Sequence, residues 1–385
     1  MMKRKICVII TARPSYSRVR TALKAIQEHP ELELQLVVAA SALLDRYGST
    51  VNFIESDGFH ISEKVYMVIE GATLTSSAKT TGIGIMELAT TFDNLKPDMV
   101  CTIGDRYETM ATAIAASYMN IPLVHIQGGE VTGNIDEKVR HAITKLSDLH
   151  LVSNDDAKQR LIKMGEYEHK IFITGCPSID IARTVRDAPE LDFDPCNKYG
   201  GVGKYIDYKK DYIVVMQHPV TTEFDEARKQ ADALIKVIHE LNMPTFWFWP
   251  NPDAGSDGTS NALRSYREEN PNNQIRFFKN MEGGDFLKLL LHSKCLIGNS
   301  SVGIRECSYL GVPVVNIGSR QNRRLRGKNV ADTNYEINNL REAIESQILH
   351  GHYPEEHLYG DGTAGKAIAD VLAVAQTEIK KVISY

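Results

Sequence analysis

Three carboxylates in the first half of the chain lie where acid–base chemistry could use them. Asp105 follows an apolar run at 99–104, and Glu130 lies in a glycine-containing loop after a second run at 122–127. Asp136 falls in the first turn of the next predicted helix, where the helix dipole favours an anion. Carboxylates held close together repel one another, which separates their pKa values and supplies both an acid and a base. The pattern therefore indicates proton-transfer chemistry at one edge of a sheet.

Each of these side chains also has a simpler interpretation. Asp105 could only cap the helix that follows it, and Asp136 could only form a helical ion pair with Arg140, four residues later. The convergence of three carboxylates is what favours catalysis over these local roles. Glu137 and His141 have helical i, i+4 spacing, but no third ligand accompanies them, so no metal site is predicted.

The second half carries the motif Gly-Asn-Ser-Ser directly after a short apolar run. Ser300 and Ser301 precede a predicted helix that contains Gly303, and we count all three residues among the candidate substrate contacts. Free N–H groups at a helix start, together with two hydroxyls, can bind a diphosphate. Glu306 lies six residues after Ser300 and could reach a ribose diol. The simpler alternative is a serine N-cap without a ligand.

Further polar residues also follow predicted strands. His218 ends one strand, and Asn251 occupies the same topological position after the next. After the first strand, Arg13 and Ser17 could meet a phosphate or a uracil through a guanidinium fork and helix N–H groups. Arg13 could instead be a solvated loop residue, and Ser17 could be only a helix cap. Arg320 begins a run of basic residues that we interpret as a local phosphate site.

Short apolar runs alternate with helical patterns along the chain, which is typical of parallel α/β sheets. A segment at 187–211 lacks a periodic apolar pattern and is interpreted as a connection between two such series. Two consecutive open α/β halves predict a ligand cleft between them, outside the carboxyl ends of the strands. The first βα turn has no G-x-G-x-x-G, so a nicotinamide dinucleotide is not expected. The predicted strands are 6–10, 34–40, 99–104, 122–127, 149–154, 171–175, 212–219, 245–251, 275–280, 295–301 and 312–318.

Composition sets limits on the class of protein. The 385 residues are 43% hydrophobic and 24% charged, as in globular proteins, and the formal net charge is −5. Bulk attraction to nucleic acid or to an anionic membrane is therefore not expected. The N-terminal apolar run spans only 6–10 and predicts a buried strand and not a signal peptide. The six cysteines are scattered, which predicts reduced core residues in a cytoplasmic protein.

The chain resembles the hydrolysing UDP-N-acetylglucosamine 2-epimerases of sialic and legionaminic acid biosynthesis over about residues 5–375. The resemblance rests on "GDRYE", "HIQGGEVTGNIDEKVRHAITKL", "GCPSID", "QHPVTT", "PNPDAGS", "GNSSVGIRE" and "GSRQNRR". It implies a GT-B-like pair of Rossmann-type domains with an interdomain active-site cleft. The first domain would span 1–185, and a C-terminal helix at about 366–385 would pack back on it. The second domain would span 186–365. It also implies a homodimer or homotetramer, a UDP-sugar substrate, and neither a metal nor another cofactor.

The family reaction would remove the C2 proton, eliminate UDP in the anti sense and hydrate the resulting 2-acetamidoglycal to N-acetylmannosamine. By position, the resemblance assigns acid–base roles to Asp105 and Asp136. It assigns UDP contacts to His218, which we also count among the catalytic candidates, and to Asn251, Ser300, Ser301 and Glu306. It assigns phosphate or uracil contacts to Arg13, Ser17, Arg106 and Arg320.

One position departs from the family pattern. Gln127 stands where the family often has Glu, and a Gln side chain cannot act as a general base. We therefore expect Glu130 to join Asp105 and Asp136 in catalysis, with Gln127 as a substrate contact. A GT-B glycosyltransferase and a non-catalytic UDP-sugar sensor stay open as alternatives. The sugar could be N-acetylglucosamine or its 2,4-diacetamido-2,4,6-trideoxy relative.

Overall fold

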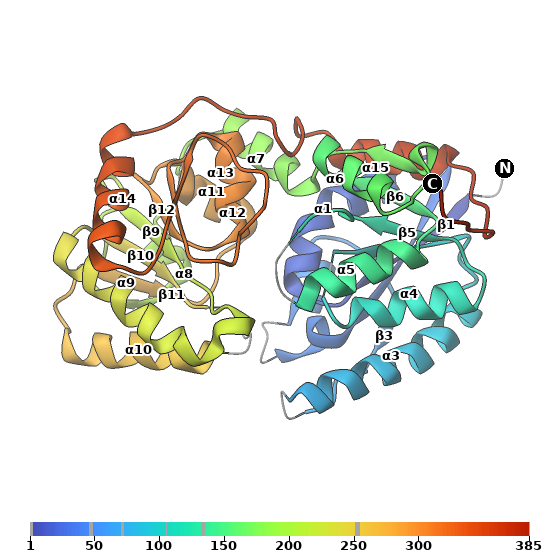
Figure 1. The fold of residues 1–385 in the computed structure, drawn as a ribbon, viewed down its shortest axis with the longest axis horizontal. Helices are drawn as coiled ribbons and strands as arrows, with labels where there is room; N and C mark the ends of the chain where they lie inside the picture. The colour runs from blue at the N-terminus through green and yellow to red at the C-terminus, as the bar shows by residue number, and fades with distance from the viewer. Residues whose placement is uncertain are drawn as a thin grey trace. The chain divides into compact units, whose positions relative to one another are not determined.

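The protein is described from a computed structural model, which describes residues 3–45, 49–70, 73–104, 106–131, 135–250 and 255–384. The chain divides into two compact units (Figure 1). Unit 1 comprises Met1–Glu130, Ile135–Asp180 and Tyr359–Tyr385, and unit 2 comprises Val131–Asn134 and Ile181–Leu358. None of the helices in the described part of the chain combines the length and apolar character that a membrane span requires.

Unit 1 is built on a seven-stranded sheet in the order β3-β2-β1-β4-β5-β6-β7, with every neighbouring pair parallel. Helices connect its strands, as the alternating pattern predicted. The strands are β1 (Arg4–Ile10), β2 (Leu32–Ala39), β3 (Ile61–Val65), β4 (Met99–Ile103), β5 (Leu123–Ile126), β6 (Leu149–Val152) and β7 (Ile171–Ile173). The helices are α1 (Arg13–Glu28), α2 (Thr50–Ser56), α3 (Leu74–Leu95), α4 (Thr109–Tyr118), α5 (Ile135–Leu146), α6 (Asp155–Lys163) and α15 (Ala364–Val374); α7 (Pro177–Asp187) runs on into unit 2.

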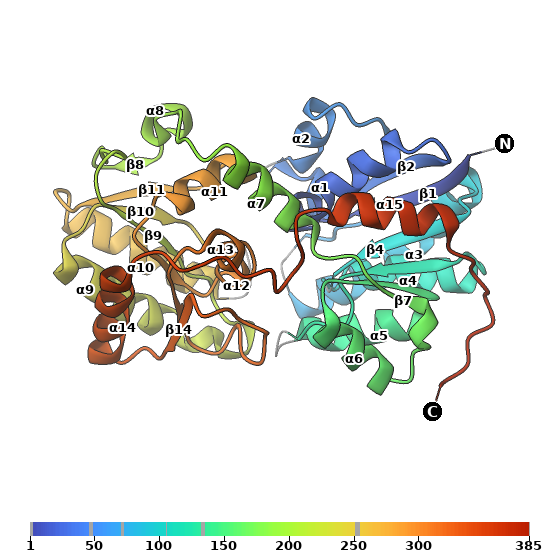
Figure 2. The same ribbon diagram turned by 90° about the horizontal axis from the view of Figure 1, so that it is seen from above.

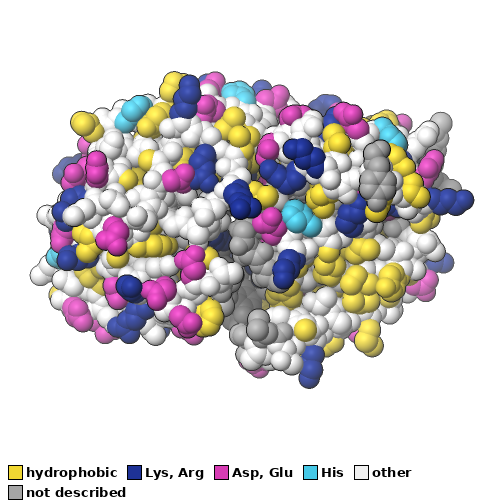
Figure 3. All heavy atoms as spheres, in the orientation of Figure 1, with side chains coloured by type: hydrophobic (Ala, Val, Ile, Leu, Met, Phe, Trp, Pro, Cys, Tyr) yellow, Lys and Arg dark blue, Asp and Glu magenta, His cyan; other side chains and the backbone are white. Residues whose placement is uncertain are grey.

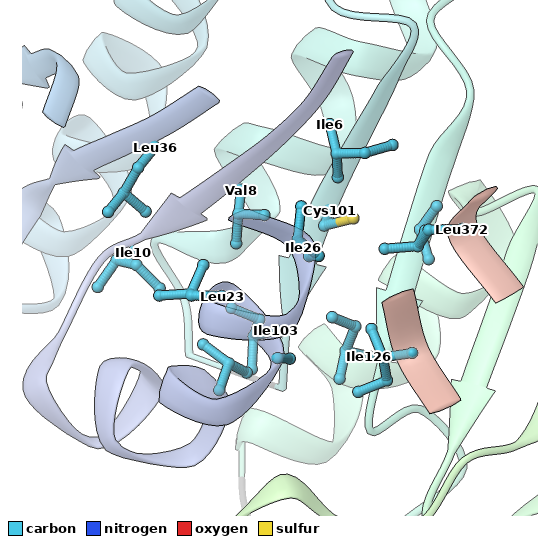
Figure 4. Packing of buried hydrophobic residues seen from close by; sticks show 14 of the residues in the cluster. Ile6, Val8, Ile10, Leu23, Ile26, Leu36, Cys101, Ile103, Ile126 and Leu372 are labelled. Atoms are coloured by element: carbon cyan, nitrogen blue, oxygen red, sulfur yellow. The ribbon is translucent and has the colours of Figure 1, made fainter. Parts of the chain in front are cut away.

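The two faces of this sheet bury alternate residues of β1. Ile6, Val8 and Ile10 pack in one core with side chains of α1 and α15, several of which Figure 4 shows as sticks. Cys7 and Ile9 pack in the other core with side chains of α3 and α4. Both faces are therefore apolar, as expected for a parallel sheet with helices on each side.

The last helix is shorter than the sequence predicted. A helix was expected over about 366–385, but α15 ends at Val374, although it does lie along α1 (Figure 2). Beyond it the Lys381 ammonium donates to the carbonyls of Thr144 and Ser147, and the Ser384 N–H donates to Gly165 O at 3.0 Å. Contacts with the rest of unit 1 hold this segment, and they override the weak intrinsic preference of its residues for helix.

Unit 2 has a second seven-stranded sheet, in the order β14-β13-β12-β9-β10-β11-β8. It is parallel except for β8, which pairs antiparallel with β11. The strands are β8 (Val202–Gly203), β9 (Ile213–Met216), β10 (Thr245–Phe248), β11 (Ile275–Phe278), β12 (Leu296–Gly298), β13 (Val314–Ile317) and β14 (Val330–Thr333). The helices are α8 (Pro195–Tyr199), α9 (Ala227–Leu241), α10 (Ser256–Glu269), α11 (Gly283–Leu291), α12 (Ser301–Ile304), α13 (Glu306–Leu310) and α14 (Ile337–His350).

The segment 187–211 is more than the connection that the sequence predicted. It contains the short helix α8, capped by Asp194, whose carboxylate accepts from the Cys196 N–H at 2.8 Å. It also contains β8, which adds the edge strand of the second sheet. Two-residue strands and one-turn helices are too short to leave a periodic pattern.

The described surface carries charges of both signs. Lys and Arg side chains are interspersed with Asp and Glu on the face that Figure 3 draws. This distribution agrees with the small net charge of −5. All six cysteines are buried free thiols, as expected of core residues.

Candidate functional site

The carboxyl end of β5 presents Gln127 in an uncommon backbone conformation. Gln127 is buried with φ of 65°, in the left-handed region, and its N–H donates to Leu151 O at 2.9 Å. Its side-chain amide donates to Cys176 Sγ at 2.9 Å. Non-glycine residues keep such a conformation only where their surroundings enforce it, and they cluster at functional sites. The structure thus gives Gln127 a fixed buried position, and its contact with substrate stays a prediction.

Glu130 is a buried carboxylate at the end of the loop that follows β5. Its side chain accepts a hydrogen bond from Ser153 Oγ at 3.1 Å, and the residue is 7% exposed. Its carbonyl accepts from Nη1 of the buried Arg140 at 2.8 Å. The Arg140 guanidinium therefore supports the loop that carries Glu130, a role that the sequence did not predict.

Asp136 lies where the sequence placed it, in the first turn of α5 and partly exposed. The loop that carries Glu130 precedes this helix, so both carboxylates follow β5. Asp105 lies outside the described residues, directly after Gly104 at the end of β4. The convergence of all three carboxylates thus stays a prediction.

The predicted phosphate or uracil contacts of unit 1 have local partners. Arg13 begins α1, and its guanidinium lies 4.7 Å from the ring centroid of Phe53. Ser17 is exposed on the same helix. Arg106 donates through Nε to Glu108 Oε1 at 2.8 Å, and the Glu108 side chain is only 1% exposed. Arg106 therefore already compensates a buried carboxylate, a structural role that holds with or without a ligand.

At the carboxyl edge of the second sheet, Asn299 organises the backbone around His218. Asn299 Oδ1 accepts from the His218 N–H at 2.8 Å, and its Nδ2 donates to His218 O at 2.8 Å. The Asn299 carbonyl accepts from Arg320 Nη1 at 3.1 Å and from Gln321 Nε2 at 2.8 Å. This fully buried residue ties together β9, β12 and the loop after β13. Sequence reasoning missed its role, although the Gly-Asn-Ser-Ser motif contains it.

The His218 imidazole is buried and neutral at pH 7. Burial lowers its pKa well below the usual value, and the charge of Arg320 lowers it further. A neutral imidazole can donate one hydrogen bond to a phosphate oxygen, but it does not supply a proton as imidazolium. The geometry therefore fits the predicted UDP contact better than a role as general acid.

Buried neutral histidines predict a loss of stability in mild acid. His125 of β5 is fully buried, which lowers its pKa to about 3. Its pKa in the unfolded chain is about 6.5, so between these values the unfolded state binds the extra proton and folding becomes less favourable as the pH falls. We expect His125 alone to lower the free energy of unfolding by about 2 kcal/mol between pH 7 and pH 5. Urea unfolding at both pH values measures this change, and an unchanged midpoint would contradict it.

The helix expected after Gly-Asn-Ser-Ser is divided into two short pieces. Ser300 caps α12, accepting from the Val302 N–H at 3.5 Å, and Ser301 Oγ accepts from Arg305 Nη2 at 3.0 Å. Arg305 separates the two pieces, as the C-cap of α12 and the N-cap of α13, with φ of −103° and ψ of −72°. Gly303 and its β-branched neighbours have low helix propensity, so tertiary packing decides the backbone here.

Glu306 begins α13 and is 8% exposed. Among the described residues, Glu306 Oε2 has no hydrogen-bond partner, and it lies 3.8 Å from Arg305 Nε. A buried carboxylate oxygen is stabilised by a donor, which a ligand hydroxyl would supply. Gly303 packs against β13, since a Cβ there would lie 2.8 Å from Val314 Cγ1. Asn251 lies outside the described residues.

The described residues contain no group of three or more His, Cys, Asp or Glu side chains that could hold a metal ion. The candidate chemistry thus comprises two sets of residues, one at the carboxyl edge of each sheet. Unit 1 supplies buried and helix-terminal carboxylates. Unit 2 supplies hydroxyls, a neutral imidazole, an arginine and a carboxylate.

Comparison with known proteins identifies the family. Residues 24–373 match the family model described as UDP-N-acetylglucosamine 2-epimerase. The chain belongs to this family. Family membership argues against the glycosyltransferase and sensor alternatives, and it confirms the resemblance predicted from the motifs.

Relatives match over nearly the whole chain. A "UDP-N,N'-diacetylbacillosamine 2-epimerase (hydrolyzing)" from Legionella pneumophila is 34% identical over 375 residues, covering 96% of this chain and 96% of the relative. A "polysialic acid biosynthesis protein P7" from Escherichia coli is 35% identical, covering 89% of this chain and 85% of the relative. These matches place the chain among relatives that include hydrolysing UDP-sugar 2-epimerases.

Solved structures share the fold. A UDP-GlcNAc 2-epimerase from Neisseria meningitidis, bound to UDP-GlcNAc, superposes with a TM-score of 0.79 at 18% identity, covering 96% of this chain and 99% of that one. A UDP-GlcNAc 2-epimerase from Methanocaldococcus jannaschii also gives a TM-score of 0.79, at 17% identity, covering 96% of this chain and 100% of that one. The predicted GT-B-like pair of Rossmann-type sheets is therefore confirmed.

Proposed function

We propose that the chain converts UDP-N-acetylglucosamine and water into UDP and N-acetylmannosamine. The observation that carries the proposal is the buried Glu130 carboxylate at the carboxyl edge of the first sheet, in a chain of this family. The Glu130 carboxylate accepts a hydrogen bond from the Ser153 hydroxyl, and a carboxylate is a group that can take up a substrate proton. Asp136, at the start of the following helix, supplies a second ionisable group.

The proposed reaction has two steps, an elimination and a hydration. A carboxylate removes the C2 proton of the sugar, a C1=C2 double bond forms, and the C1–O bond to UDP breaks with its electron pair leaving on the diphosphate. Water then adds to the 2-acetamidoglycal, with hydroxide at C1 and a proton at C2 on the opposite face. Asp105, Glu130 and Asp136 carry the proton transfers, which typically contribute about 10²–10⁴-fold each.

The leaving diphosphate is bound by unit 2 in this proposal. Ser300 and Ser301 supply hydroxyls, and Arg320 carries positive charge beside the neutral His218 imidazole. Charge-assisted and hydroxyl hydrogen bonds stabilise the negative charge that develops as UDP departs. Glu306 Oε2 is a suitable acceptor for a ribose hydroxyl.

A second substrate is favoured by the relatives. The chain is 34% identical to a hydrolysing enzyme named for UDP-N,N'-diacetylbacillosamine, and 33% identical to one from Campylobacter jejuni named for the GDP or UDP form of the same sugar. The same elimination and hydration would apply, because the chemistry takes place at C1 and C2 of either sugar.

Parallel incubations with the two UDP-sugars test the proposal. We expect UDP and the free 2-epimeric sugar to be released in equal amounts from one of them, measured by ion-exchange chromatography. Formation of UDP-N-acetylmannosamine without release of UDP would contradict the hydrolytic step. Release of UDP without a change at C2 would contradict the epimerisation.

A further inference from the structure

The buried histidine of β5, His125, contacts all three segments that lead to the candidate carboxylates. Its ring lies against Gly104, Gly128 and Thr144, which belong to the end of β4, the loop after β5 and the helix α5. We propose that His125 and Thr144 together are positioning residues that fix these segments for proton transfer. This inference rests on the proposed function and extends it to two residues outside the substrate contacts.

The first contact fixes the backbone next to Asp105. His125 Nε2 lies 2.9 Å from Gly104 O, and a carbonyl only accepts, so Nε2 carries the hydrogen. The Gly104 N–H in turn donates to Ile126 O at 3.0 Å. Gly104 has φ of 74° and directly precedes Asp105 in the sequence. Gly104, the residue before Asp105, is therefore held by β5 through both its N–H and its carbonyl.

The second contact reaches the helix that begins beside Asp136. His125 Nδ1 lies 3.1 Å from Thr144 Oγ1, and both side chains are fully buried. Because Nε2 carries the hydrogen of the neutral ring, Nδ1 accepts from the threonine hydroxyl. Asp136 lies eight residues before Thr144 on α5, about two helical turns away. The pair thus links the end of β4 to the helix that carries Asp136.

The third contact limits the loop that leads to Glu130. A Cβ added to Gly128 would lie 2.8 Å from His125 Nδ1 and 3.3 Å from Thr144 Oγ1. The loop backbone therefore rests directly on the hydrogen-bonded pair, two residues before Glu130. A single buried pair accordingly contacts all three segments, so its removal displaces more than one carboxylate.

Variants of His125 can separate the two hydrogen bonds. In His125→Gln the side-chain amide reaches the place of Nε2 and keeps the donor to Gly104 O, whereas His125→Asn keeps an acceptor near Nδ1 for Thr144. We expect His125→Ala to lower kcat by about 10²-fold, as small misplacements of catalytic groups do, and each amide variant to recover part of it. KM and the Kd for UDP should stay within about twofold, because UDP is expected to be bound mainly by unit 2.

Thr144→Val supplies an independent variant if His125→Ala does not fold. This variant removes only the hydroxyl. In the double variant His125→Gln/Thr144→Val we expect kcat to fall no further than in the more affected single variant, because both changes break the same hydrogen bond. His150→Asn is the matched control, since His150 is the cross-strand partner of His125 in β6 and bonds Glu166 instead. We expect this control to lose stability while kcat stays within about twofold of the wild-type value.

Wild-type kcat in both His125→Gln and Thr144→Val, or an equal loss in His150→Asn, would overturn the inference. If the wild-type chain released no UDP from either sugar, the proposed function would fail instead. Positioning would then be tested by the amide ¹⁵N shifts of Gly104 and Gly128. We expect these to move in His125→Asn and to stay in place in His150→Asn, and unmoved shifts in both would overturn the inference.

Discussion

Replacing Glu130 by Gln is expected to lower kcat by about 10²–10⁴-fold while the affinity for UDP stays unchanged. Gln has nearly the same shape and can still accept from Ser153 Oγ, so the loop should keep its structure. A side-chain amide cannot take up the substrate proton. Steady-state kinetics give kcat, and calorimetric titration with UDP gives the affinity.

Glu166→Gln is the matched control for this variant. Glu166 is also a buried carboxylate of unit 1, but it bonds His150 at 2.9 Å and Lys145 at 2.7 Å. Its hydrogen bonds lower its pKa to about 2, despite burial that raises it. We expect Glu166→Gln to reduce stability and leave kcat nearly unchanged. Wild-type turnover in Glu130→Gln would remove Glu130 from the mechanism.

Replacing Asn299 by Ala is expected to affect both folding and UDP binding. The change leaves the N–H and the carbonyl of His218 without their partners, and each unsatisfied buried group costs about 1–3 kcal/mol. The free energy of unfolding should fall by about 2–6 kcal/mol. Because the Asn299 side chain fixes the backbone of His218, a predicted UDP contact, we expect the Kd for UDP to rise at least about tenfold, the equivalent of about 1.4 kcal/mol.

Asn316→Ala separates the two effects. Asn316 is a buried amide of the same sheet, and it donates to Asp332 Oδ1 at 2.7 Å. We expect this variant to lose stability while its affinity for UDP stays within about twofold. Urea unfolding and calorimetric titration measure the two quantities. Equal UDP affinity in Asn299→Ala and the wild type would contradict the assigned role of Asn299.

The central strands could be predicted from the sequence because they are buried on both faces. The run at 6–10 corresponds to β1, and the run at 99–104 corresponds to β4, each within two residues at either end. Buried parallel strands are continuous apolar runs, which few other elements resemble. The same reasoning predicted the start of α5 and so the place of Asp136.

Two of the edge strands escaped prediction for the opposite reason. β3 and β14 lie at the edges of their sheets, and their residues are mostly exposed or partly buried. Their sequences, "ISEKV" and "VADT", therefore contain polar residues and no apolar run. The end of α15 at Val374 was also mispredicted, since contacts of Lys381 decide the path of the chain beyond it.

The candidate residues of the site could be proposed from the sequence, whereas the residues that support them could not. Motif residues such as Glu130 and Ser300 could be proposed because polar groups after strands are a visible pattern. Asn299, Arg140 and His125 act through partners that are distant in sequence, up to 81 residues away for Asn299 and His218. Only the folded chain shows which backbone groups such buried polar side chains satisfy.

Proton NMR of the reaction in heavy water tests the central claim most directly. Removal of the C2 proton and hydration of a glycal require that solvent supply the new hydrogen at C2. We therefore expect UDP together with the free 2-epimeric sugar carrying deuterium at C2. A free sugar that keeps the original hydrogen at C2 would contradict the elimination mechanism and the roles given to the three carboxylates.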